Sequence, residues 1–303
     1  MNAIEIRNLT KNFGEKRALC GLNMTVPVGA IYGFIGENGS GKSTTEKLIC
    51  GLLPPSGGEI RLFGKDYRDE TVRSGIGVLI ESPGCFPGYS VWNNLMLQAA
   101  NRNLPDAEKE VRRVLRLVRM EGAASNKYKN CSLGMKQRIG IAMALMGNPN
   151  LLILDEPING LDADGMRIMR EILTEITRER STTVLVSSHI LGELEKIATH
   201  YGIVRGGRMI REMTAQELEA DCPSFVALRA QNAEGAKALL CRRYPRVREE
   251  NGYLRVYGGV KAGEIVSYLC ENGIFVSEIG TDKIGLEEYY TDLMKEREGE
   301  SEI

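Results

Sequence analysis

Residues 36–43 read GENGSGKS, which fits the pattern G-x-x-x-x-G-K-[ST]. The short apolar run AIYGFIG ends at the first glycine, and a segment with helix-forming residues and Leu48, Ile49 and Leu52 at helical spacing follows. Glycines let the backbone turn so that several N–H groups point inward at phosphate oxygens, and the start of a helix adds a favourable dipole. The order of strand, glycine loop and helix therefore predicts a phosphate-binding loop in an α/β protein.

The side chains of this loop have separate expected roles. Lys42 should hold the β- and γ-phosphates of a nucleotide, and Ser43 should bind Mg²⁺. The alternative, a glycine-rich turn with an exposed lysine, is disfavoured by the strand before it and the helix after it. The residues expected to surround the nucleotide here are Gly36, Glu37, Asn38, Gly39, Ser40, Gly41, Lys42, Ser43 and Thr44.

Besides the phosphate-binding loop, a segment with carboxylates is needed, because magnesium and water require carboxylates on the other side of the phosphates. The segment LLILDEP supplies them, since its apolar residues predict a buried strand that ends at Asp155 and Glu156. We expect Asp155 to hold the Mg²⁺ shell and Glu156 to act as general base on the attacking water. Alone, such a pair is more often a solvated strand end; the phosphate loop favours the catalytic interpretation.

His189 follows a second apolar strand, TTVLVSSH. In an open α/β sheet the carboxyl ends of the strands face the ligand crevice, so His189 is predicted to contact the γ-phosphate and take part in catalysis. A single histidine is otherwise usually structural. His200, the other histidine, has no such position and is given no role.

The chain order predicts an α/β cassette over residues 1–213. Period-two alternation from Ala3 to Gly29 indicates an antiparallel N-terminal subdomain, and the alternation of strands and helices beyond it indicates a mostly parallel core sheet. A helical subdomain is expected at about residues 86–146. There Asp106 is a candidate N-cap for a helix with Val111, Val114, Leu115 and Val118 on one face.

Near Met213 the pattern changes to shorter strands and helices. We expect a small α/β accessory domain over residues 214–303, with a last helix that includes GLEEYYTDLMKE and then a polar, disordered C-terminal tail. This part contains no phosphate loop and no metal-ligand cluster, so it is predicted to regulate or brace rather than to catalyse.

Composition narrows the function further. The 39 Lys and Arg against 40 Asp and Glu give a formal net charge of −1, which disfavours nucleic acid as a partner. The seven cysteines are scattered and form no C-x-x-C pair, as expected for free thiols in a reducing cytosol. The N-terminal segment predicts no secretory signal. No apolar stretch reaches the ~20 residues that span a bilayer, so a membrane role is expected only through a partner.

Five segments in this order, GENGSGKST, CSLGMKQR, LLILDEP, NGLD and SSH, resemble those of the nucleotide-binding subunit of an ATP-binding-cassette (ABC) transporter. The resemblance covers about residues 1–213. It implies a P-loop NTPase fold of ABC type, ATP and Mg²⁺ as ligands, and ATP hydrolysis by a dimer that closes around two ATP molecules.

The resemblance also assigns residues outside the loop. In that family the helix that Ser132 and Gly134 open here binds the γ-phosphate of ATP held by the opposite subunit. By position, Phe13 should stack on adenine and Asp162 should lie at the dimer seam. Phe13 could equally be an ordinary aromatic residue of a hairpin.

Two features depart from the family pattern. Leu133 and Met135 replace a glycine and a glutamine of the usual signature, and Glu81 stands where a glutamine that contacts Mg²⁺ is usual. Glu81 keeps an oxygen ligand and adds charge near the metal, but it lacks the amide donor; the alternative is a loop glutamate that points to solvent. LIESPGCFPGYSVWNNL and SLGMKQR together resemble the branch that serves bacitracin resistance and lantibiotic immunity.

We therefore expect an ATPase subunit, cytoplasmic and peripheral on the inner face of the cell membrane. It would pair with itself or with a second ATPase subunit and drive a separate transmembrane permease. The branch suggests export of a peptide antibiotic or another amphiphile. The alternatives are a soluble ABC-type ATPase with a non-transport partner, which would show tandem cassettes or a coiled-coil insertion, and a regulatory module that binds ATP without turnover.

Overall fold

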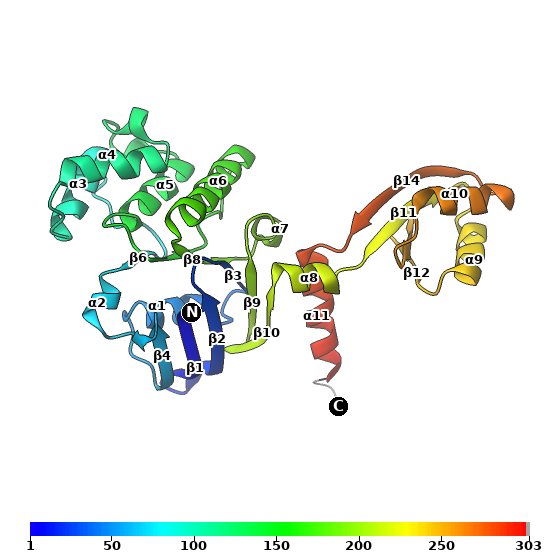
Figure 1. Ribbon diagram of the computed structural model, residues 1–303, viewed down its shortest axis with the longest axis horizontal. Helices are drawn as coiled ribbons and strands as arrows, with labels where there is room; N and C mark the ends of the chain where they lie inside the picture. Colours follow the sequence, from blue (N-terminus) through cyan, green and yellow to red (C-terminus); the bar gives the residue numbers. More distant parts are fainter. Residues whose placement is uncertain (301–303) are drawn as a thin grey trace. The chain divides into compact units, whose positions relative to one another are not determined.

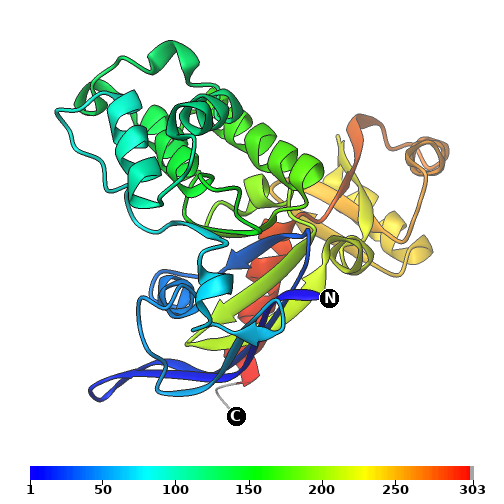
Figure 2. The same ribbon diagram turned by 60° about the vertical axis from the view of Figure 1, so that its left-hand side comes forward.

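The computed structural model describes the backbone of residues 1–300 and the side chains of residues 1–295. The chain divides into two units, Met1–Ala215 and a second that begins at Gln216. Figures 1 and 2 show the elements of each, and the two units are described separately below.

The N-terminal part of the first unit is an antiparallel sheet with the strand order β2-β1-β4-β5. Alternating residues of the two long strands are buried, including Ile4, Ile6, Met24 and Val26, because one face packs on the core while the other faces water. The antiparallel subdomain expected from the period-two pattern is confirmed. Its strands are β1 (Asn2–Phe13), β2 (Lys16–Pro27), β4 (Gly57–Leu62) and β5 (Lys65–Asp66).

The core sheet has the order β10-β9-β3-β8-β7-β6, parallel except where β10 pairs antiparallel with β9. Every residue of β3, β7 and β8 is buried, as expected of parallel strands covered on both faces. The register pairs Asp155 with Ser187 and Ile35 with Ser188, so three strands end at one edge of the sheet. The strands are β3 (Ile31–Ile35), β6 (Ile76–Leu79), β7 (Leu151–Asp155), β8 (Thr183–Ser188), β9 (His200–Arg205) and β10 (Arg208–Thr214).

The helices of the first unit cover this sheet and build the helical subdomain, which lies on the opposite side of the sheet from β1, β2 and β4 (Figure 1). The N-cap prediction is confirmed, because the Asp106 carboxylate accepts a hydrogen bond from the Lys109 N–H at 3.2 Å. The four valine and leucine positions predicted for one face of that helix are all buried. The helices are α1 (Lys42–Ile49), α2 (Glu70–Arg73), α3 (Val91–Asn101), α4 (Ala107–Leu117), α5 (Leu133–Ala144), α6 (Ala163–Arg180) and α7 (Leu191–Leu194).

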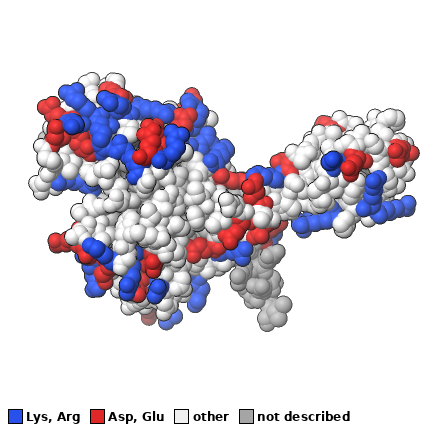
Figure 3. All heavy atoms as spheres, viewed as in Figure 1, with Lys and Arg blue, Asp and Glu red and all other residues white. Residues whose placement is uncertain are grey.

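Charged side chains are unevenly spread over the first unit. Figure 3 shows lysine and arginine gathered over the helical subdomain, with acidic side chains between them, and a largely uncharged band beneath it. The band separates this charged surface from the one over the end of the unit that holds β1 and β4.

The second unit contains a βαββαβ arrangement with an antiparallel sheet of order β12-β13-β11-β14, which is the ferredoxin-like topology. Val226, Leu228, Leu254 and Leu269 are among the residues of its core. The elements are α8 (Ala215–Asp221), β11 (Ser224–Ala230), α9 (Ala233–Arg243), β12 (Val247–Glu250), β13 (Tyr253–Tyr257), α10 (Ala262–Glu271), β14 (Val276–Lys283) and α11 (Leu286–Glu300).

The last helix is longer than the sequence indicated. The predicted helix segment ends at Glu296, whereas α11 continues to Glu300, so the start of the predicted disordered tail is helical. Residues 301–303 of that tail lie outside the described residues.

Candidate nucleotide-binding site

The loop between β3 and α1 is shaped by its glycines. Gly41 precedes α1 with a φ of +113°, a backbone conformation that favours glycine. A Cβ at Gly36 would lie 2.4 Å from the Val204 carbonyl oxygen, and one at Gly41 would lie 2.7 Å from Leu19 Cδ2. A side chain at either position would therefore displace the turn, because the loop packs closely against β9 and β2.

Lys42 is the first residue of α1, and its side chain is only 6% exposed. Its ammonium group donates to the carbonyl oxygens of Gly36 at 2.6 Å and Glu37 at 3.2 Å, so the side chain folds back across the loop. The buried Ser40 hydroxyl has no hydrogen-bond partner in the structure. A cation and a free hydroxyl inside a glycine loop fit a phosphate group.

Asp155 and Glu156 follow one another at the end of β7, but their side chains have different partners. Asp155 is buried and accepts a hydrogen bond from the Ser187 hydroxyl at 2.8 Å. The Glu156 N–H donates toward both the Ser187 hydroxyl and the Ser187 carbonyl oxygen at 3.2 Å. Ser187, on the neighbouring strand β8, therefore links the two acidic residues and fixes their orientation.

Glu156 connects the lysine of the loop with the histidine after β8. Its Oε2 lies 2.8 Å from His189 Nδ1, and its Oε1 lies 4.0 Å from Lys42 Nζ. Glu156 adopts a φ of +50°, uncommon for a residue other than glycine, directly after the end of β7. The structure thus brings together three side chains predicted separately from distant segments.

Sequence reasoning missed two residues of this site. Ser187 is one; the polar Ser-Ser pair at the end of an otherwise apolar strand was the available signal. The other is Glu46, which is fully buried on α1 one turn after Lys42. Burial, and to a lesser extent the charge of Asp155, raises the pKa of Glu46 to about 8. A charged residue on the buried face of the predicted helix was the signal for Glu46.

The residues assigned to the opposite subunit's nucleotide lie on a separate part of the unit. Ser132 is the exposed N-cap of α5 and accepts a hydrogen bond from the Met135 N–H at 3.3 Å. A Cβ at Gly134 would lie 3.5 Å from Leu161, in the segment after β7. Asp162 in that segment is the N-cap of α6 and accepts from the Gly165 N–H at 2.8 Å. The start of α5 therefore contacts the NGLD segment of its own chain.

Phe13 and Glu81 lie at the surface. Phe13 ends β1 with about half of its side chain exposed, and the Lys11 ammonium lies 5.1 Å from the centre of its ring. Glu81 follows β6 with a side chain that is 71% exposed and bonded to Lys47 Nζ at 2.7 Å. That hydrogen bond from Lys47 lowers the pKa of Glu81. The structure thus pairs Glu81 with a lysine of α1, and its role toward Mg²⁺ stays a prediction.

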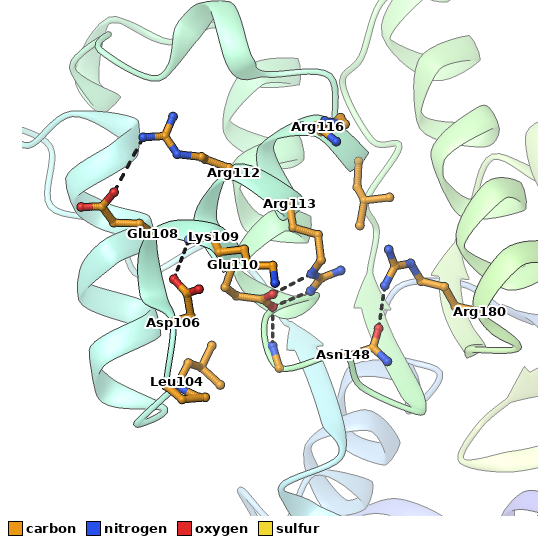
Figure 4. A pocket seen from close by; sticks show the side chains of 13 residues that line it. Leu104, Asp106, Glu108, Lys109, Glu110, Arg112, Arg113, Arg116, Asn148 and Arg180 are labelled. Atoms are coloured by element: carbon orange, nitrogen blue, oxygen red, sulfur yellow. Dashed lines mark hydrogen bonds and ion pairs between the residues drawn. The ribbon is translucent and has the colours of Figure 1, made fainter.

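A cavity of about 780 Å³ lies in the helical subdomain (Figure 4). Its walls carry the ion pairs Arg113–Glu110 and Arg112–Glu108. None of the predicted site residues lines it.

A glycine loop between a parallel strand and a helix, with an acidic pair at the end of a nearby strand, defines a nucleotide-hydrolysing protein of the P-loop class. The comparisons narrow this class. A family model described as ABC transporter matches residues 19–159. The bacitracin transport ATP-binding protein BcrA of Enterococcus faecalis is 35% identical over 296 residues, covering 96% of this chain and 96% of that protein. The chain therefore belongs to the family of ABC transporter ATP-binding proteins.

Other similar proteins agree with this membership. The lantibiotic transport ATP-binding protein SrtF of Streptococcus pyogenes is 38% identical over 209 residues, 69% of this chain and 90% of that protein. The solved structure of cbiO1 from Clostridium perfringens, part of the ABC transporter complex cbiONQ, has a TM-score of 0.66 at 29% identity, over 73% of this chain and 91% of that one. A dimeric ATP-binding cassette in a post-hydrolysis state with ADP and Pi has a TM-score of 0.64 at 24% identity, over 70% and 98%, and supports the fold alone.

The predicted family resemblance and fold class are confirmed, and the protein is an ATP-binding and ATP-hydrolysing subunit coupled to transport. Nothing in the comparisons favours a soluble non-transport ATPase or a regulatory module without turnover. In the part of the chain that the structure describes, no helix has the length and apolar character needed to cross a membrane.

Proposed function

We propose that this chain binds ATP with Mg²⁺ at the loop of residues 36–44, and that Glu156 is the general base of hydrolysis. The observation that carries the proposal is the position of Glu156 between two cation-forming side chains, with one oxygen 2.8 Å from His189 Nδ1 and the other 4.0 Å from Lys42 Nζ. A carboxylate that is hydrogen-bonded to His189 and faces the Lys42 ammonium keeps a defined orientation, which general-base catalysis requires.

Each residue then has a distinct task. Lys42 leaves the loop carbonyl oxygens to bind the β- and γ-phosphates. Glu156 accepts a proton from the attacking water, and His189 orients Glu156 and reaches the γ-phosphate. Ser43 and Asp155 would hold Mg²⁺, whose chemistry is to neutralise charge on the phosphate oxygens. The fit is supported by the buried Asp155 carboxylate, which the Ser187 hydroxyl orients.

We infer further that Ser132 and Gly134 serve the nucleotide of a second copy. Both lie at the N-terminal end of α5, where the backbone N–H groups of a helix favour an anion. The exposed Ser132 hydroxyl is available to a partner from outside the chain. Asp162 at the start of α6 would lie at the same seam, and Phe13 would stack on adenine.

A separate membrane subunit is the proposed partner, which would place the chain at the cytoplasmic face of the membrane. A cavity of about 370 Å³ lies between the β6 edge of the core and helices α3 and α5. Leu52, Pro83, Gln98 and Met143 are among the residues that line it, and Leu52 is largely exposed. An apolar groove beside the segment that contains Glu81 suits a helix of the partner and would couple its motion to the site.

The proposed cargo is a peptide antibiotic or a similar amphiphile, moved outward. Its support is the relatives' names, bacitracin transport for BcrA and lantibiotic transport for SrtF. BcrA matches almost the whole chain, including the second unit, whereas SrtF matches 69% of it. We therefore favour a bacitracin-like peptide over a lantibiotic.

The test is made in the bacterium that carries the gene. Glu156→Gln at the chromosomal locus should raise sensitivity to bacitracin as much as deletion of the gene does. Glu179→Gln, a matched change at an exposed position on α6, should have no effect. If deletion leaves sensitivity to bacitracin and to lantibiotics unchanged, the cargo proposal is wrong. ATPase activity of the purified protein, measured alongside, separates that outcome from a failure of the catalytic assignment.

A further inference from the structure

Strand β14 forms one edge of the sheet in the second unit. It pairs with β11 on one side, and no other strand in the described part of the chain pairs with its other side. Seven of its eight residues are exposed. Its outer edge therefore presents a row of backbone N–H and C=O groups that a further strand could bind.

This edge is long and free of proline, and it carries the charged residues Glu278, Asp282 and Lys283. Its pairing with β11 is regular from Ser224 to Arg229, and a register shift follows between Glu278 and Val276. The opposite edge of the sheet, β12, is only four residues long, which limits pairing there. The long edge is thus the one open to a partner.

Apolar side chains accompany the open edge. Phe275, directly before β14, is 66% exposed, and Ile279 near the middle of the strand is 38% exposed. Large exposed apolar residues on an unpaired edge strand mark either an aggregation site or an interface.

We propose that β14 pairs antiparallel with β14 of a second copy of this chain, with Ile279 opposite Ile279 at the two-fold axis. The two four-stranded sheets would then form one continuous sheet of both copies. The pairing would hold two cassettes together independently of nucleotide. This proposal rests on the proposed function in one respect, namely that two copies of the ATP-binding unit act together.

The length and the charges of the strand together select this register. The middle of Val276–Lys283 lies between Ile279 and Gly280, so registers centred on Ser277 or Thr281 would leave more of the strand unpaired. In an antiparallel pair, residues directly opposite each other have side chains on the same face of the sheet. When a two-fold axis relates the two strands, this condition is met only if the axis passes beside a residue that lies opposite its own copy. Centring on Glu278 would place two carboxylates opposite each other, and centring on Gly280 would place Glu278 opposite Asp282. Both arrangements are destabilising because like charges repel across the pair.

Centring on Ile279 removes these conflicts. Glu278 then lies opposite Gly280, and Ser277 lies opposite Thr281, which can hydrogen-bond across strands. Val276 comes opposite Asp282, and Phe275, directly before the strand, comes near Lys283 of the other copy, whose aliphatic stem and ammonium group can contact its exposed ring. No like charges oppose each other in this register, which favours a second copy over an unrelated peptide.

Disulfide cross-linking tests the register in the full-length protein. The exposed thiols Cys241 and Cys270 are first changed to serine. In this background Ile279→Cys should cross-link two copies on mild copper-catalysed oxidation without nucleotide, because opposing Cα atoms in a sheet are ~4.5–5.5 Å apart. Lys283→Cys is the matched control, since its two copies would be roughly 27 Å apart along the strands. Equal cross-linking at both positions, or none at Ile279→Cys, would overturn the proposal.

A charge substitution tests the interface without oxidation. Wild type should be a dimer by light scattering in the absence of nucleotide, Ile279→Lys should be a monomer, and Ile279→Thr should remain a dimer. Circular dichroism confirms that each variant folds. A nucleotide-free wild-type monomer contradicts the pairing. ATP-driven dimerisation of a Glu156→Gln protein would still be expected in that case, so the two ideas fail separately.

Discussion

His189 Nδ1 lies 2.8 Å from Glu156 Oε2, and this contact joins the ends of two strands that are neighbours in the core sheet. The parallel register that pairs Asp155 with Ser187 places the two following segments side by side. The contact therefore depends on the sheet order rather than on any local sequence feature. A change that shifted β8 by one residue would separate the pair and leave both side chains present.

The first prediction concerns Glu156. Glu156→Gln keeps the size of the side chain and removes the proton acceptor, so ATP should bind while turnover falls by about 10²–10⁴-fold, the usual contribution of a general base. Steady-state phosphate release and nucleotide binding measure the two effects. When Glu156→Gln is combined with Ile279→Lys, which removes the proposed nucleotide-independent pairing, a stable ATP-dependent dimer should accumulate and be visible by gel filtration. Turnover near that of wild type in the purified variant would refute the role of Glu156.

The second prediction concerns Glu46 and pH. Its pKa is about 8 in the folded protein, mainly through burial, against an ordinary value of 4.5. Above pH 4.5 the unfolded chain releases this proton while the folded protein keeps it. This contribution therefore lowers the free energy of unfolding as pH rises from about 4.5 to 8, by up to about 1.4 kcal/mol per pH unit.

Glu46→Gln removes the ionisation and nearly keeps the shape. Urea unfolding of the nucleotide-free protein should show that the variant gains stability relative to wild type at pH 8 and much less at pH 5. A difference between the two proteins that is the same at both pH values would show that Glu46 does not retain its proton on folding.

The third prediction concerns Glu81, which pairs with Lys47 of α1 at 2.7 Å. If Glu81 acts near the metal, Glu81→Gln should shift the Mg²⁺ concentration needed for half-maximal turnover, because one carboxylate is lost beside the phosphates. Lys47→Gln should shift it too, since the carboxylate is then no longer held by α1. Unchanged Mg²⁺ titrations in both variants would favour a glutamate that only forms a surface ion pair.

Much of the core could be predicted because its parallel strands and its glycine loop can be recognised from short segments of sequence. Fully apolar runs such as residues 151–154 indicate buried parallel strands, and a lysine after a glycine loop indicates a phosphate site. Strands β9 and β10 were not anticipated, because their segment HYGIVRGGRMIREMT contains charged residues and a glycine pair and does not alternate clearly. The pairing of β10 with β9 is a tertiary contact that no window of sequence shows.

The site was predictable in its residue types and not in its geometry. Lys42, Glu156 and His189 were each inferred from their own segment, whereas their mutual contacts depend on the strand order. The left-handed backbone of Glu156 and the link through Ser187 likewise depend on neighbouring strands. Glu46 was missed because a buried carboxyl group contradicts the apolar pattern by which buried helix positions are recognised.

The last prediction concerns Ser132 and Gly134, which we propose serve the nucleotide of the opposite copy. Gly134→Asp would place a carboxylate where the γ-phosphate docks, and Lys42→Ala removes the phosphate anchor, so each homodimer should be inactive. In a mixed dimer, one site receives both defects. The other pairs an intact Lys42 with an intact Gly134 if the signature acts in trans. Nucleotide trapping should then return at that site.

Because turnover can require two working sites, trapping of ATP is the more direct measurement. Subunit exchange is first verified with differently tagged copies, and mixing each variant with tagged wild type serves as the positive control. If the signature acted on the nucleotide of its own chain, every site of the mixed dimer would carry one defect and nothing would return. Action across the interface would leave one site intact, with Lys42 from the Gly134→Asp chain and Gly134 from the Lys42→Ala chain. Verified mixed dimers that trap no more ATP than either parent would therefore rule it out.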